Sequence, residues 1–330
     1  MSVCETPAPV ISVVIPVKDG GQSFRRCLQA IQSQKVREEI EIVVVDSGST
    51  DGTREVARSF GARVHEIPSS EFNHGGTRNL GAELARGETI AFTVDDALPI
   101  GDGWLESLTA PLREESRLAG TYSRQVPNED APAHLRHYIE FRYGPTPRVQ
   151  RAGSAAELTV ATTLFSNVSS AIRRSVLGEI PFSDHIVTGE DLDWCGRVLL
   201  AGYEVAYVPD SVVRHSHRFT LASTFRRYFD QGAAAERTVL RAGPSSSRAV
   251  RSEGIRLVGR ELAWMWRSGE RRAIPYTIAW DATRYAGFRL GVHHRALPPS
   301  LRRRLSNVPS HWSAAEEAGG ATPTRSSPEA

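Results

Sequence analysis

The chain has 330 residues, enough for one large α/β core with an appendage. Its 40 basic and 38 acidic side chains give a net charge of +2. No DNA-reading motif accompanies the arginines spread along the C-terminal part, so we expect no nucleic-acid partner. Three widely spaced cysteines, Cys4, Cys27 and Cys195, argue against a disulfide framework or a zinc site and indicate a reducing compartment.

No secretory or membrane-crossing segment is recognisable. The N-terminus lacks the basic start and apolar core of a signal peptide, and no apolar run reaches the ~18 residues of a membrane span. Residues 232–330 nonetheless carry 16 basic and 8 acidic side chains, a balance that suits a phosphate-rich partner or an anionic membrane surface. We expect a cytoplasmic protein, with a peripheral position at the cytoplasmic face of a membrane as an option.

Over the first hundred residues the apolar pattern alternates between strands and helices. Buried strands are expected at residues 10–17, 41–46, 63–67 and 89–94. Helices are expected between them, the first with Phe24, Cys27, Leu28 and Ile31 on one face. This alternation predicts a mostly parallel sheet flanked by helices, with right-handed crossovers.

The alternation loosens after Pro99. Residues 126–158 are rich in proline and polar groups, and we interpret them as a mobile or acceptor-facing insertion. Residues 306–330, rich in Ser, Pro, Ala and Gly, are predicted to be disordered. The remaining expected elements are helices at 102–112, 192–200, around 255–265 and at 275–290, and strands at 118–125 and 204–208.

The strand at 89–94 ends in two adjacent carboxylates, Asp95 and Asp96, before a turn at Pro99. Ligands of open α/β sheets collect at the carboxyl ends of such strands. Two neighbouring carboxylates repel each other unless a cation or several donors lie between them, and hard oxygen ligands suit Mg²⁺ or Mn²⁺ shared with a diphosphate. The alternative is a strand-end Asp that caps the next helix.

Other polar groups follow predicted strands or occupy loops at the same edge of the sheet. They are Asp46 with Ser49 and Asp51, then Glu190-Asp191, and finally His215 and His217. Together with Asp95 and Asp96 they could face one cleft, bind a metal–diphosphate and still leave one carboxylate as a base. An oxidoreductase on a Rossmann sheet would need Gly-x-Gly-x-x-Gly after the first strand, which Lys18–Ser23 does not supply.

The order of these motifs resembles the family 2 inverting glycosyltransferases of GT-A fold. The similarity begins with Val13–Pro16 and Val43–Thr53 and continues through Asp95-Asp96, Glu190-Asp191 and His215–His217. Two further stretches, Phe72–Asn79 and Arg284–Gly291, are similar to bacterial rhamnosyltransferases that build surface polysaccharides. That branch carries Gln where Val94 or Asp95 stands, so the role of Asp95 stays open between the ribose and the metal.

The resemblance implies a domain division and a set of donor contacts. The catalytic domain would span residues 1–230, with a nucleotide-binding half at about 10–100 and an acceptor half at about 101–230, followed by a basic helical region at 231–305 and the tail. Asp46 resembles the acid that accepts the N3–H of a uracil or thymine ring, while the fork of Arg78 would reach the base or the diphosphate. The implied substrate-binding residues are Pro16, Asp19, Asp46, Ser49, Asp51, Arg78, Asp95, Glu190 and Trp194.

Roles in catalysis and metal binding follow in the same way. Asp96 would hold Mg²⁺ or Mn²⁺, and Asp191 would be the base that deprotonates the acceptor hydroxyl. His215 and His217 alternate along a strand-like segment, so only one, preferably His217, is expected to face the metal. Several of these residues also have a purely structural explanation. It is turn and cap chemistry for Asp46 and Asp51, helix-dipole stabilisation for Glu190 and Asp191, and core packing for Trp194.

We therefore expect an inverting, metal-dependent glycosyltransferase that moves rhamnose from dTDP-rhamnose to a hydroxyl of a glycan or lipid-linked saccharide. The alternatives are another donor, such as a UDP-hexose or GDP-mannose, and a non-catalytic nucleotide-sugar or glycan-binding protein. The basic C-terminal region would dock on a membrane beside a lipid-linked acceptor. Otherwise it would form a helical pair that packs on the catalytic domain or makes a homodimer contact.

Overall fold

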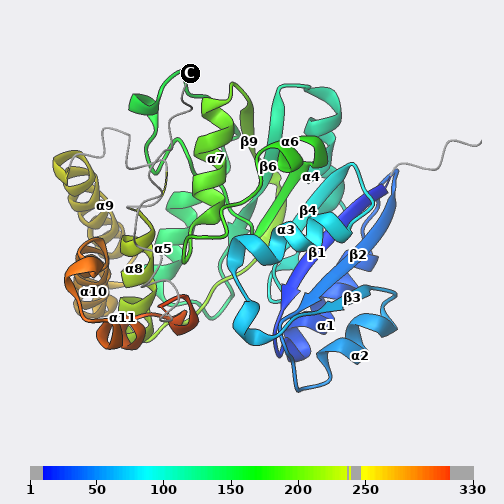
Figure 1. Ribbon diagram of the computed structural model, residues 1–330. Helices are drawn as coiled ribbons and strands as arrows, with labels where there is room; N and C mark the ends of the chain where they lie inside the picture. The colour runs from blue at the N-terminus through cyan, green and yellow to red at the C-terminus, as the bar shows by residue number, and fades with distance from the viewer. Residues whose placement is uncertain (1–9, 236–237, 239–246, 313–330) are drawn as a thin grey trace, which may run out of the picture.

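The structure, a computed structural model, describes residues 10–235, 238 and 247–312 (Figure 1). Its core is a nine-stranded sheet in the order β3-β2-β1-β4-β8-β6-β9-β5, with β7 paired to β9. The first half of the sheet is parallel, as the sequence predicts. Its strands are β1 (Val10–Val17), β2 (Glu39–Asp46), β3 (Arg63–Glu66) and β4 (Thr89–Thr93).

The second half of the sheet is mixed. Only β6 and β9 run parallel there, and β8 pairs antiparallel with both β4 and β6. The short strands β5 and β7 also pair antiparallel with β9. The strands of this half are β5 (Leu98–Pro99), β6 (Leu118–Val126), β7 (Arg148–Gln150), β8 (Ser169–Arg173) and β9 (Glu204–Arg214).

Helices cover both faces of the sheet and bury one apolar core on each. One core contains Phe24 and Leu28 of α1 with Trp104 of α4, and the other contains Trp194 of α7 with Leu135 of α5. The helices are α1 (Gly21–Gln32), α2 (Thr53–Ser59), α3 (His74–Leu84), α4 (Trp104–Glu114), α5 (Ala133–Arg142), α6 (Arg174–Glu179), α7 (Glu190–Leu200), α8 (Leu221–Ala235), α9 (Ser247–Arg267), α10 (Ile274–Val292) and α11 (Pro299–Leu305).

The secondary structure differs from the expected elements in three places. The expected insertion at 126–158 contains α5 and β7, because Leu135, Ile139 and Tyr143 supply a buried face that its polar composition conceals. Strand β9 continues to Arg214 instead of ending at residue 208. Residues 306–312 of the expected disordered tail are ordered by burial of Trp312, whereas 313–330 lie outside the described residues.

The C-terminal helices α8, α9, α10 and α11 lie together beside the rest of the molecule (Figure 1). Helices α8 and α10 cross at glycines, since a Cβ at Gly232 would lie 2.1 Å from the Phe288 carbonyl oxygen and one at Gly291 would lie 2.0 Å from that of Phe229. His134 of α5 contacts the ring of Trp280 at 4.7 Å between centroids. The C-terminal helices therefore contact α5, one of the helices that cover the sheet. Among the described residues, no helix is long and apolar enough to span a bilayer.

Glu41 holds together the edge of the sheet opposite to the predicted cleft. Its carboxylate accepts hydrogen bonds from Ser12 Oγ at 2.6 Å, the Arg86 amide at 2.7 Å and Arg63 Nη1 at 2.6 Å. Burial alone would raise the pKa of this carboxyl, but these hydrogen bonds hold it at about 2, below the ordinary 4.5. Its ionisation therefore stabilises the fold above pH 4.5, and this stabilisation is lost as the pH falls toward 2.

Glu41→Gln is expected to lower the free energy of unfolding at pH 7 by about 2–3 kcal/mol, because the amide cannot accept all these donors. Urea denaturation at pH 7 and pH 3 measures the effect, which should shrink at the lower pH. Glu39→Gln on the same strand is the matched control, since the Glu39 side chain is 60% exposed. An equal decrease in the free energy of unfolding in the two variants would show that the hydrogen bonds of Glu41 stabilise the fold no more than an exposed carboxylate does.

Candidate active site

The loops that follow β1 and β2 bind each other at the carboxyl edge of the sheet. The Asp19 amide donates to Ser49 Oγ at 2.9 Å, and the Thr50 amide donates to Asp19 Oδ1 at 2.7 Å. The Gly21 amide donates to Asp51 Oδ2 at 3.1 Å, while Asp51 Oδ1 accepts within its own turn. Both oxygens of Asp51 are thus used by the loops, so the turn-and-cap alternative describes this residue.

Asp46 ends β2 below these loops and is fully buried. Its Oδ1 accepts from the amides of Gly48 at 3.1 Å and Ser49 at 2.9 Å. Its Oδ2 has no hydrogen-bond partner among the described residues. A buried carboxylate oxygen without a donor is costly. Pro16 of β1, which pairs with Val45, the residue before Asp46, is also buried.

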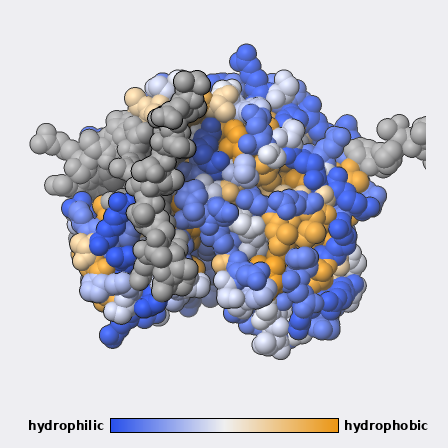
Figure 2. All heavy atoms as spheres, in the orientation of Figure 1, coloured by the Kyte–Doolittle hydropathy of each residue, from blue (hydrophilic) through white to orange (hydrophobic). Residues whose placement is uncertain are grey.

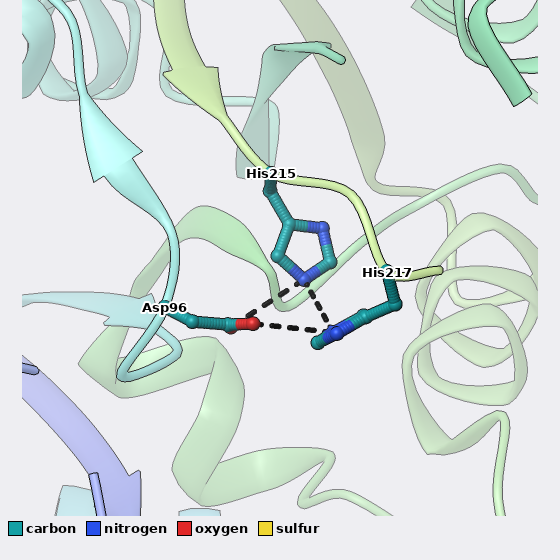
Figure 3. Close-up of side chains that lie close together, drawn as sticks. All are labelled: Asp96, His215 and His217. Atoms are coloured by element: carbon teal, nitrogen blue, oxygen red, sulfur yellow. Dashed lines mark hydrogen bonds and ion pairs between the residues drawn. The ribbon is translucent and has the colours of Figure 1, made fainter. Parts of the chain in front are cut away.

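Asp96, His215 and His217 converge on one point (Figure 3). The two histidine Nε2 atoms are 3.0 Å apart, and they lie 3.5 Å and 3.3 Å from the Asp96 carboxylate oxygens. Neighbouring ligands of an octahedral ion bound at about 2.1 Å are roughly 3.0 Å apart, so the three groups fit a single divalent cation. Asp95, next to Asp96, does not join this cluster.

The expectation that only one histidine faces the metal is wrong. It assumed that the strand continues through His217, but β9 ends at Arg214 and the chain turns before the second histidine. Gln125 on β6 supports the arrangement, because its Oε1 lies 3.3 Å from Nδ1 of His215. With the proton on Nδ1, the Nε2 lone pair would be available to a cation, which is the usual arrangement around a ligating histidine.

A cavity of about 550 Å³ opens beside Asp96. Arg26 of α1 and Arg214 of β9 contribute to its lining, together with residues 128–130. Its volume lies within the range of about 300–1,000 Å³ that is typical of ligand pockets. Asp96, Glu129 and Asp130 also line the cavity, and Arg214 pairs with Glu129 at 2.7 Å, so Arg26 is the guanidinium of this lining that has no ion pair among the described residues.

Glu190 and Asp191 begin helix α7 and have different environments. Arg78 Nη1 donates to Glu190 Oε1 at 2.9 Å, and both side chains are buried. Burial would raise the pKa of Glu190, but the Arg78 charge lowers it below its ordinary value. Burial and the Glu190 charge raise the pKa of Asp191 to about 7. Because the pKa values of the two adjacent carboxyl groups differ in this way, Asp191 can take a proton near neutral pH.

Comparisons with known proteins decide the family. Residues 12–180 match the family described as Glycosyl transferase family 2. The chain belongs to this family. Its relatives include the O-antigen chain rhamnosyltransferases WbaN of Salmonella anatum, 30% identical, and RfbN of Salmonella typhimurium, 32% identical. Each alignment covers 92% of this chain and 96% of the relative.

The fold of this glycosyltransferase is of GT-A type, as predicted. The solved mannosyltransferase PcManGT from Pyrobaculum calidifontis, in complex with GDP-Man and Mn²⁺, is similar with a TM-score of 0.61. The match covers 88% of this chain and 89% of that chain at 19% identity. At this identity the likeness shows the fold alone.

Two expected ligand contacts of the glycosyltransferase are corrected by the structure. Trp194 has no exposed surface, and its Nε1 donates to the Ile180 carbonyl at 2.8 Å, so it cannot form a stacking floor for a sugar. Its spacing on α7 places it in the core instead. Arg78 is also buried, and its Nη1 donates both to Glu190 Oε1 and to the His74 carbonyl, so this nitrogen is paired within the protein.

Asn167 is a site residue that sequence reasoning missed. Its backbone amide nitrogen lies 3.4 Å from Asp191 Oδ2, and its side-chain Nδ2 lies 3.5 Å from Glu190 Oε1. Ser170 Oγ donates to Asn167 Oδ1 at 2.9 Å and fixes the side-chain amide. Asn167, which lies in the segment before β8, thus contacts the carboxyl groups of both Glu190 and Asp191. No motif signals it, because its position depends on the antiparallel return of the chain.

Proposed function

We propose that this glycosyltransferase transfers rhamnose from dTDP-rhamnose, with inversion, to a hydroxyl of a glycan or lipid-linked saccharide in surface polysaccharide synthesis. The sugar and the pathway rest on the two O-antigen rhamnosyltransferases that align along 92% of the chain. The chemistry rests on the position of Asp191 at the start of α7, beside the buried Arg78–Glu190 pair, where burial and the Glu190 charge raise its pKa to about 7 so that it can act as a base.

In the proposed reaction Asp191 takes the proton of the acceptor hydroxyl as the hydroxyl oxygen bonds to the anomeric carbon. The bond from that carbon to the β-phosphate oxygen breaks at the same time, and the nucleoside diphosphate leaves from the opposite face. One displacement on one face inverts the configuration. Asp96, His215 and His217 would hold a divalent cation, which neutralises charge on the leaving diphosphate when it is bound.

Donor recognition is proposed at the paired loops after β1 and β2. The unpartnered Oδ2 of Asp46 would accept the N3–H of a thymine or uracil ring once a shift of residues 47–49 admits the base. Asp19, Ser49 and Asp51 hold these loops together and so position the base pocket. Asp95, whose pKa burial and the neighbouring Asp96 raise to about 6, is proposed to contact the ribose.

A different donor is the second candidate, because the solved PcManGT that shares the fold is in complex with GDP-Man and Mn²⁺. Incubation with Mn²⁺, a rhamnose-accepting glycan and either dTDP-rhamnose, UDP-glucose or GDP-mannose distinguishes these possibilities. Release of dTDP well above release of UDP or GDP is the expected result. Preference for GDP-mannose would replace the proposed donor, and absence of transfer from all of them would contradict the proposal.

The C-terminal region is proposed to approach an anionic membrane that carries a lipid-linked acceptor. Large side chains are exposed on α9 and α10, among them Trp266 at 58% and Tyr285 at 56%. Arg271 and Arg272 lie exposed between these helices. Aromatic and arginine side chains are the groups that bind at the lipid headgroup level.

A further inference from the structure

A second cavity, of about 180 Å³, lies between the start of α3 and the C-terminal end of the described chain. Residues 70–74 and Val187 line one side, while Val308, Ser310 and His311 line the other. The space-filling view shows a hollow between the lobe that carries the sheet and the lobe that carries α8, α10 and α11 (Figure 2). A segment nearly at the end of the chain therefore faces the first half of the catalytic domain.

Residues 307–312, here called the C-terminal strap, are fixed at both ends. The Asn307 amide donates to Asp230 Oδ2 on α8 at 2.8 Å. At the other end Trp312 is buried against Phe229 and Ala233 of the same helix. The residues between the two anchors are therefore held across the cavity rather than left as a free end.

The opposite wall of the cavity is tied to the proposed catalytic pair. Asn73 caps α3 by accepting from the amides of Gly75 and Gly76 at 2.9 Å. One turn later the same helix carries Arg78, which pairs with Glu190 beside Asp191. A ligand in the cavity would thus lie against the first turn of α3, one turn before the arginine that pairs with Glu190.

The lining of the cavity suits a neutral polyol better than a phosphate. The polar side chains in its lining are those of Ser70, Glu71, Asn73, His74, Ser310 and His311, and the Phe72 ring lies beside them. Among the described residues, no lysine or arginine contributes to it. Polar groups that donate and accept, set beside an aromatic ring, match the hydroxyls and the C–H face of a sugar.

We propose that the C-terminal strap completes a saccharide subsite of this enzyme, in which Ser310 and His311 select the sugar of the donor or of the acceptor. This inference rests on the proposed function. It adds a specificity-determining element outside the family match, which ends at residue 180.

The test uses three variants of the full chain: Ser310→Ala, His311→Ala and Val308→Trp, the last to fill the cavity. Ser300→Ala on α11 is the matched control, because Ser300 is exposed and does not line the cavity. Steady-state kinetics gives KM for dTDP-rhamnose and for the acceptor separately. Calorimetry gives Kd for dTDP and dTDP-rhamnose. Thermal unfolding identifies any variant that fails to fold, and Ser310, being exposed, is the substitution least able to disturb the fold.

We expect the three cavity variants to show a rise of about tenfold either in the constants for dTDP-rhamnose or in KM for the acceptor. Their Kd for dTDP should not change, and Ser300→Ala should behave as wild type. A rise in KM and Kd for dTDP-rhamnose assigns the subsite to the donor sugar, and a rise in KM for the acceptor alone assigns it to the acceptor. Values within twofold of wild type in all three variants would overturn the inference and leave the proposed function intact. A wild-type chain that neither transfers rhamnose nor binds dTDP-rhamnose more tightly than dTDP would overturn both.

Discussion

Asp191→Asn is expected to lower kcat for sugar transfer by about 10²- to 10⁴-fold, because the amide cannot take the proton of the acceptor hydroxyl. Donor binding should survive, since the amide has the shape of the carboxyl and its oxygen still accepts from the Leu192 amide at 2.9 Å, while only the longer 3.4 Å contact with the Asn167 amide is lost. Asp184→Asn is the control, because the Asp184 side chain lies nearby in sequence and is 76% exposed. An Asp191→Asn enzyme that transfers sugar at the wild-type rate would remove Asp191 from the mechanism.

The same residue predicts the pH dependence. Because burial and the Glu190 charge raise the pKa of Asp191 to about 7, the base is protonated, and therefore inactive, below that pH. The kcat/KM of the wild-type enzyme should fall about tenfold per pH unit well below pH 7, since this constant reports groups of the free enzyme. A profile flat down to pH 5 would contradict this assignment.

The second large effect is expected at the cation site. Alanine at Asp96, His215 or His217 should lower transfer by about 100-fold, because each removes one of the three converging ligands. Mn²⁺ should support activity better than Mg²⁺, since imidazole nitrogens suit transition metals whereas Mg²⁺ prefers oxygen. His65→Ala, at an exposed histidine of β3, is the control.

Activity after chelation with EDTA distinguishes the possible outcomes. Wild type should lose activity and regain it with Mn²⁺, whereas the three variants should regain little at the same concentration. Full activity of the wild-type enzyme in EDTA would mean that Asp96 and the two histidines serve another purpose.

Much of the first half of the fold could be predicted because apolar runs and polar punctuation alternate cleanly there. Strand β1 occupies residues 10–17 as expected, and Asp46 ends β2 where the apolar run stops. The second half could not be predicted with the same certainty, because β8 returns antiparallel between β4 and β6. That return brings Asn167 to Asp191, and sequence spacing carries no record of it.

Side-chain direction limited the prediction of the site. Asp96 and Asp191 follow from strand and helix ends, which local sequence marks. The joint orientation of His215 and His217 depends on the residue at which β9 stops, and Trp194 has the same helical spacing whether it faces a sugar or the core. The C-terminal strap was missed because its Ser- and Pro-rich composition gives no sign that the Asn307 amide and the Trp312 side chain anchor its two ends on α8.

The most direct test of the account is calorimetric titration of dTDP, with and without Mn²⁺, into wild type, Asp96→Ala and Asp191→Asn, followed by assay of the same samples with dTDP-rhamnose and acceptor. We predict tight, Mn²⁺-dependent binding for wild type and Asp191→Asn, weak metal-independent binding for Asp96→Ala, and transfer by wild type alone. Equal, metal-independent binding of dTDP by all three proteins, or transfer by Asp191→Asn, would contradict it.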